Sequence, residues 1–242
     1  FSDVTKKHTS RDTARVFMAG NEFTTPDERD MLAGWQKPFF FARFLLFGAL
    51  FVLLCLVFAN MHPGGYYFLM ISLSCIIPIS LLILVWEMNI PRNISLGFIL
   101  LIVMMGGILS LIATMILSKV NPLTHAIWAP LTEEPAKLLI AAIIIGKKDY
   151  KFMLNGILIG VAVGTGFAIF ENIFYSFNGF VQGGYTAGLI SASIRALTDI
   201  PGHGLYAGLY CGALVMVKWK EKLKPKHFFK PKFLLYFYLF PF

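Results

Sequence analysis

Six long apolar runs restrict the fold of this chain more than any other feature, and they cover residues 39–59, 66–86, 97–117, 125–145, 152–175 and 185–217. Each run is long enough to cross the roughly 30 Å of hydrocarbon in a bilayer as an α-helix. The 242 residues are 57% hydrophobic and 14% charged, with a mean hydropathy of +0.70, and a soluble domain of this length would not tolerate that composition. The sequence therefore predicts an all-α, polytopic transmembrane helical bundle of about six spans.

The charges of the loops predict how the chain is oriented in the membrane. Segment 146–151 carries three lysines, and segment 218–232 carries seven lysines and one glutamate. Cytoplasmic loops of membrane proteins are enriched in Lys and Arg, so we expect both segments and the N-terminus to be cytoplasmic. The uncharged loops 60–65 and 176–184 should then lie outside. Because the net charge of +8 is concentrated in short loops, we do not expect nucleic-acid binding.

The two ends of the chain differ from the regular spans. Residues 1–37 are polar, and Thr25-Pro26-Asp27-Glu28 predicts the start of a short cytoplasmic helix; residues 38–242 form the predicted membrane-embedded domain. For segment 218–232 to be cytoplasmic, run 185–217 must cross only once, so we expect a broken or re-entrant helix that bends near Pro201-Gly202. Residues 233–242 are predicted to be a truncated last apolar segment, shorter than a full span.

Several polar side chains lie inside the predicted spans, where each costs several kcal/mol unless it is paired or hydrated. They are Glu133, Glu134, Lys137, Glu171, Asn172, Arg195, Asp199 and His203. Helical spacing predicts that Glu133 pairs with Lys137, while Glu134 is turned away by about 100°. The spacing of Arg195, Asp199 and His203 by four residues suits an Arg–Asp pair whose Asp orients the His.

Depth in the membrane indicates which of these groups can meet. At 1.5 Å per residue, Glu133 lies roughly 18 Å above Ile145, and His203 lies roughly 21 Å above Val217. The two side chains could therefore lie side by side. Glu171 lies about 30 Å from the start of its helix, near the external edge, and joins them only if that helix tilts or the site opens outward.

Glutamate plus histidine is a set that activates water by general-base catalysis, with or without a metal. The chain has no HExxH, GxSxG or GxGD motif of other membrane proteases. Of the two adjacent acids, Glu134 is the first choice for the general base. Two other functions use the same residues: an ion-coupled transporter or channel, in which they form an ion path, and a non-catalytic membrane-binding or immunity protein. A transporter would more often show repeated halves, and none is evident.

Three motifs in successive spans resemble one known family. Glu133-Glu134-Pro135-Ala136-Lys137 matches EExxK, Phe167 to Glu171 followed by Asn172 matches FxxxE, and Arg195 with Pro201-Gly202-His203 matches a third motif around a membrane histidine. In this order they resemble the PrsW family of intramembrane proteases, distant relatives of the CAAX-processing enzymes. The resemblance covers about residues 97–217, and family members usually carry a further histidine motif on a last helix.

The resemblance implies an intramembrane protease of the bacterial plasma membrane. Its substrate would be a single-span membrane protein, such as an anti-sigma factor, cut on the extracytoplasmic side. The implied catalytic residues are Glu133, Glu134, Glu171 and His203. A divalent metal, most simply zinc, would be bound by Glu134, Glu171 and His203. The supporting residues would be Lys137, Asn172, Arg195 and Asp199.

Overall fold

The computed structural model describes residues 39–91, 93–120, 129–147 and 150–239. These residues form helices joined by short connections, without a strand, which confirms the predicted all-α class for this part of the chain. The polar segment 1–37 and the helix expected from Thr25 lie outside the described residues.

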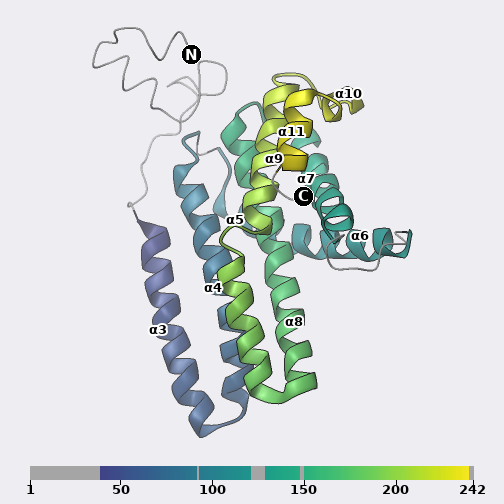
Figure 1. Ribbon diagram of the computed structural model, residues 1–242. Coiled ribbons are helices and arrows are strands. Elements are labelled where there is room, and N and C mark those ends of the chain that lie inside the picture. Colours follow the sequence, from purple (N-terminus) through teal and green to yellow (C-terminus); the bar gives the residue numbers. More distant parts are fainter. Residues whose placement is uncertain (1–38, 92, 121–128, 148–149, 240–242) are drawn as a thin grey trace, which may run out of the picture.

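Figure 1 shows the long helices α3 and α4 beside a long hairpin formed by α8, with α9, α10 and α11 gathered at one end of the bundle. The helices are α3 (Phe40–Met61), α4 (Gly64–Met88), α5 (Leu96–Leu101), α6 (Gly107–Val120), α7 (Pro130–Lys147), α8 (Met153–Thr198), α9 (His203–Lys218), α10 (Pro225–Phe228) and α11 (Pro231–Leu239), and a π-helical turn, η2 (Ile102–Gly106), joins α5 to α6.

Among the described residues, four helical stretches are long and apolar enough to cross a membrane: Phe40–Met61, Gly64–Met88, Leu96–Lys119 and Met153–Lys218. The predicted count of about six spans is therefore not confirmed. Helix α7 does not qualify, because its 18 residues include two glutamates and two lysines. The stretch Met153–Lys218 contains two antiparallel arms, which the sequence had indicated as two separate runs.

Helix α8 folds back on itself at Gly183 and Gly184. Gly184 has φ of 73°, a conformation that glycine adopts at little cost. We call residues 153–182 the first arm of α8 and residues 185–198 its second arm. The second arm ends at Thr198 and α9 begins at His203, so the predicted break near Pro201-Gly202 is confirmed. Proline lacks a backbone N–H, which explains why the helix stops there.

A row of glycines lets α9 lie directly against the first arm of α8. A Cβ atom on Gly160 would overlap the carbonyl oxygen of Ala207, and one on Gly164 would overlap the carbonyl oxygen of His203. Small residues at this spacing permit close helix contact in membranes. The close approach fixes the height of His203 relative to the first arm of α8.

The third apolar run bends at η2. Figure 1 shows α6 lying across the direction of α3, α4 and α8, so this run is not a straight span. A π-helical turn is a common cause of such a bend. Gly107, directly after the turn, packs against the backbone of Gly166 in α8, where a side chain would clash. Helix α6 also packs against α7 and thereby helps to hold α7 beside α8.

The remaining segments close the bundle. The carboxylate of Glu87 accepts hydrogen bonds from the backbone N–H groups of Phe40 (2.7 Å) and Phe41 (3.1 Å), which caps the start of α3. Helix α11, which overlaps the segment predicted to be a truncated apolar run, packs against α9 and buries Phe233 and Phe237. The rings of Tyr210 and Phe237 lie 5.3 Å apart.

Candidate active site

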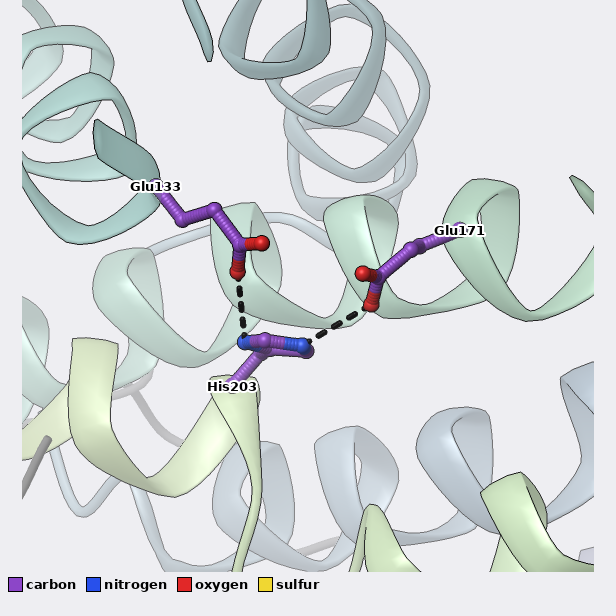
Figure 2. A group of neighbouring side chains, drawn as sticks. All are labelled: Glu133, Glu171 and His203. Atoms are coloured by element: carbon purple, nitrogen blue, oxygen red, sulfur yellow. Dashed lines mark hydrogen bonds and ion pairs between the residues drawn. The ribbon is translucent and has the colours of Figure 1, made fainter. Parts of the chain in front are cut away.

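Three helices bring the predicted polar residues into one cluster. Glu133, Glu134 and Lys137 lie in the first two turns of α7, Glu171 lies in the first arm of α8, and His203 is the first residue of α9. Figure 2 shows Glu133 and Glu171 approaching the two ring nitrogens of His203 from different sides. The meeting of Glu133 and His203 expected from their depth is thus confirmed, and Glu171 joins them.

His203 lies at the centre of the cluster. Its Nε2 is 3.0 Å from Oε2 of Glu171. On the other edge of the ring, Nδ1 is 2.7 Å from Nζ of Lys137, 3.6 Å from Oε1 of Glu134 and 3.8 Å from Oε2 of Glu133. The rings of Phe167 and His203 meet in an edge-type arrangement, with 5.0 Å between their centroids. These contacts fix the ring between the acids of α7 and the acid of α8.

Lys137 contacts both acids of its own helix. Its Nζ lies 2.7 Å from Oε1 of Glu134 and 3.5 Å from Oε2 of Glu133. The predicted pairing with Glu133 is present, but the expectation that Glu134 is turned away from Lys137 is wrong. Residues at i,i+3 and i,i+4 both lie on the same helix face, so one long lysine side chain can reach both.

Arg195 and Asp199 are joined through Asn172 rather than to each other. Arg195 donates to Glu171 through Nη2 and to Oδ1 of Asn172 through Nε, at 2.6 Å for the latter. Asn172 in turn donates to Asp199 through Nδ2. The predicted Arg195–Asp199 pair that orients His203 is therefore wrong. Asp199 caps the second arm and still donates its backbone N–H to the carbonyl oxygen of Arg195 at 3.0 Å, but the guanidinium binds Glu171 on the antiparallel arm instead of the Asp199 carboxylate.

Exposure divides the cluster into two layers. The side chains of His203, Glu133 and Glu171 are 20%, 14% and 12% exposed, whereas Glu134 and Lys137 are 2% and 0% exposed. Water or a substrate can therefore reach the first three groups more easily. Glu134 and Lys137 lie behind them as a buried pair.

A cavity of about 170 Å³ lies next to the cluster, between α4, α8 and α9. Gly204, which follows His203, and Asp199 both line it. Most of the wall is apolar, and two of its side chains, Ile200 and Leu205, are about half exposed. The cavity thus adjoins Gly204 and reaches the apolar outer surface of the bundle, while Glu133, Glu171 and His203 are not among its lining residues.

Two aromatic residues at the site were not predicted. The ring of Tyr175 lies 4.4 Å from the guanidinium of Arg195, one helical turn from Glu171. Tyr210 is fully buried within electrostatic reach of Glu134, and neither its hydroxyl nor Oε2 of Glu134 has a hydrogen-bond partner among the described residues. Tyr210 follows His203 by seven residues, two helical turns, and this spacing was the signal that could have found it. Phe167, part of the FxxxE match, holds Lys137 over its ring at 3.9 Å from the centroid.

The fold and the cluster define a polytopic membrane protein whose carboxylates and histidine lie together among apolar helices. The model of the PrsW family of intramembrane metalloproteases matches residues 92–241, so the chain belongs to this family and is an intramembrane protease. No curated protein and no solved structure matches the chain.

The residues at the site fit the metal that the family description implies. Glu133, Glu171 and His203 each offer one ligand atom, and these atoms lie within 4.8 Å of one another. The sequence had suggested Glu134 in place of Glu133. Oε2 of Glu134 remains a buried acceptor without a partner among the described residues, so this carboxylate also has a lone pair to offer. Imidazole and carboxylate ligands together suit zinc and similar divalent ions.

Proposed function

We propose that this protein hydrolyses a peptide bond in a single-span membrane protein, with Glu133, Glu171 and His203 as the residues that touch the reacting atoms. The observation that carries the proposal is the meeting of two carboxylates and one imidazole from three helices, with Nε2 of His203 3.0 Å from Glu171. Groups at this spacing can accept a proton from water and return it to a leaving amine.

The general base in this proposal is Glu133. The sequence favoured Glu134, but that carboxylate is 2% exposed and lies 2.7 Å from the lysine ammonium, so water reaches it poorly. Glu133 is more exposed, and its Oε2 lies farther from the same ammonium, at 3.5 Å. Glu133 therefore takes the proton of the attacking water, while Glu134 holds Lys137 in place.

Glu133 returns the proton of the attacking water to the departing amine, and Glu171 and Arg195 hold the ring of His203 beside it. Glu171 accepts from Nε2 of the ring, and Arg195 donates to the same carboxylate oxygen of Glu171. The first backbone N–H groups of a helix have no partner within the helix, and α9 begins at His203 itself. These groups offer donors to the oxygen that becomes negative when water adds to the peptide carbonyl.

The metal in this proposal is zinc, held by His203 with carboxylates of Glu133, Glu134 or Glu171. When bound, such an ion lowers the pKa of water and polarises a carbonyl oxygen. Removal of the metal with a chelator should stop cleavage, and added zinc should restore it. Cleavage that continues unchanged after complete metal removal would contradict this part of the proposal.

The substrate is proposed to be a single-span regulator of the anti-sigma-factor type in a bacterial plasma membrane. Its segment would approach from the bilayer, where the cavity beside His203 reaches the apolar surface of the bundle. A cavity of about 170 Å³ is smaller than typical ligand pockets and suits one side chain of the substrate. The lysine-rich loops support an orientation with the N-terminus in the cytoplasm.

The test is cleavage in proteoliposomes. The purified chain is reconstituted with a panel of single-span model proteins, and the products are identified by mass spectrometry. The proposal predicts a cut in the outer half of the membrane segment, which is lost in Glu133→Gln and His203→Ala. Cleavage that survives both changes would contradict the assigned site. Ion flux through the same liposomes without any cleavage would favour a transporter instead.

A further inference from the structure

Lys137 is the most enclosed charged group of the cluster. Its side chain is 0% exposed, and its Nζ contacts Oε1 of Glu134 at 2.7 Å, Nδ1 of His203 at 2.7 Å and Oε2 of Glu133 at 3.5 Å. The ring of Phe167 covers another side at 3.9 Å. An ammonium has three N–H donors and no acceptor, so these three acceptors satisfy it completely.

This arrangement determines which nitrogen of His203 carries the hydrogen. Because Lys137 can only donate, Nδ1 of His203 must accept, and the lone pair of Nδ1 is directed at the ammonium. The hydrogen of the neutral ring is then on Nε2, where Oε2 of Glu171 accepts it at 3.0 Å. While Lys137 stays in place, neither nitrogen of the ring is free to bind a metal.

The atoms around the Lys137 ammonium are the ligand types that a divalent metal would use. One imidazole nitrogen and two carboxylate oxygens surround a single point. Zinc binds such atoms at about 2.0–2.2 Å, which is closer than an ammonium approaches them. The ammonium and a metal cannot occupy this point together, because both are cations and both need the same lone pairs.

We propose that Lys137 and the metal compete for one cation position between Glu133, Glu134 and His203, and that Lys137 thereby sets the metal affinity of the site. The inference rests on the proposed function only in taking a divalent metal as the ligand. Oε2 of Glu134 is a buried acceptor without a partner among the described residues, so the carboxylate can keep the displaced ammonium while it binds the metal. Lys137 is thus a positioning residue that holds the acids and the imidazole together in the metal-free protein.

The test measures metal binding and not proteolysis. The full chain is purified in detergent, stripped of metal and titrated with Co²⁺ by calorimetry and by visible absorption. Lys137→Met is expected to bind one Co²⁺ more tightly than the unchanged protein by about 10- to 100-fold, the range that groups beside a metal ligand contribute. Lys222→Met, the same change at an exposed lysine, is the matched control and should leave the affinity unchanged.

A second change locates the ion. Adding His203→Ala to Lys137→Met should abolish the tight binding, because the imidazole supplies the nitrogen ligand. Co²⁺ should also raise the unfolding temperature of Lys137→Met more than that of the unchanged protein, since the metal replaces the missing charge beside Glu134. Equal or weaker Co²⁺ binding by Lys137→Met, or no binding by either protein, would overturn the proposal.

A third measurement uses the unchanged protein and does not depend on the folding of a variant. Lys137 is fully buried, so a water-soluble acylating reagent followed by mass spectrometry should modify it slowly without metal. Saturating Co²⁺ should increase its modification several-fold, while the modification of Lys222 stays constant. Protection of Lys137 that is unchanged or stronger with Co²⁺ would contradict displacement. All three results can be obtained whether or not a cleaved substrate has been found, so failure of this inference is distinguishable from failure of the proposed protease function.

Discussion

Two adjacent glutamates at the start of α7 have different surroundings. Glu134 is buried against Lys137 and close to the phenol of Tyr210, whereas the side chain of Glu133 is 14% exposed and lies 3.8 Å from Nδ1 of His203. Neighbouring residues of a helix point about 100° apart, so one can face the buried lysine more directly while the other borders the accessible part of the site. The pair therefore combines a buried ion-pair partner with a group that can meet water.

The two glutamates should respond differently to loss of charge. Glu133→Gln should reduce the cleavage rate by at least about 10²-fold with little change in stability, because a general base contributes this much. Glu134→Gln should lower the free energy of unfolding by about 3–5 kcal/mol, because it leaves the buried ammonium without its closest partner. Cleavage rates and unfolding in detergent measure both effects. A large loss of stability in Glu133→Gln with none in Glu134→Gln would reverse the assignment.

The contribution of Arg195 to cleavage should depend on the shape of its guanidinium as well as on its charge. Its guanidinium donates to Glu171 and to Asn172 through different nitrogens, which one ammonium cannot reproduce in the same plane. Arg195→Lys is expected to slow cleavage by about 10- to 100-fold, since Glu171 then holds His203 less firmly. The control is Arg43→Lys, the same change at an exposed arginine of α3 that is distant from Arg195 in the sequence. A cleavage rate for Arg195→Lys within twofold of the control would show that the two separate donors of the guanidinium are not needed.

The sequence singled out the members of the cluster but not all of their pairings. Glu133, Glu134, Lys137, Glu171 and His203 stood out because charged and polar groups are costly in apolar spans. The partner of Arg195 depends on the register between two antiparallel arms, and helical spacing within one segment does not contain that register. Tyr210 was missed because an aromatic residue in an apolar run is not costly there, so only its spacing of seven residues from His203 marks it.

At the scale of the helices, close contact between α8 and α9 positions His203. Gly160→Ala should lower the free energy of unfolding by about 1–3 kcal/mol, because the added methyl group overlaps the backbone of α9. Cleavage should fall in parallel, since α9 carries His203. Gly97→Ala makes the same change in open space and should be neutral or slightly stabilising. Equal unfolding temperatures for the two variants would argue against the packing role.

Breaks and turns differed in how well the sequence revealed them. The break before α9 was predictable because Pro201 cannot donate a backbone hydrogen bond and Gly202 follows it. The bend at η2 was not predicted, since a π-helical turn inside an apolar run leaves no clear pattern in residue types. That bend turns α6 across the bundle and explains why the run at 97–117 does not behave as a straight span.

At the scale of the whole molecule, the two ends of the bundle should lie on opposite sides of the membrane. Figure 1 places the connection between α3 and α4 at one end and α10 at the other. Asn60→Cys should react with a membrane-impermeant thiol reagent in intact cells, and Lys222→Cys should react only after the membrane is opened. The native cysteines are buried or half-buried, and labelling of the unchanged protein measures their background reaction. The reverse pattern would invert the proposed orientation.

His203, between the acids of α7 and α8, is expected to be essential for peptide hydrolysis inside the membrane. The direct measurement is the single-turnover rate of substrate cleavage in proteoliposomes by the unchanged protein and by His203→Ala, with unfolding temperatures measured alongside. We expect a rate at least about 10³-fold lower for His203→Ala in a protein that still folds. A folded His203→Ala protein that cleaves within tenfold of the original rate would contradict it.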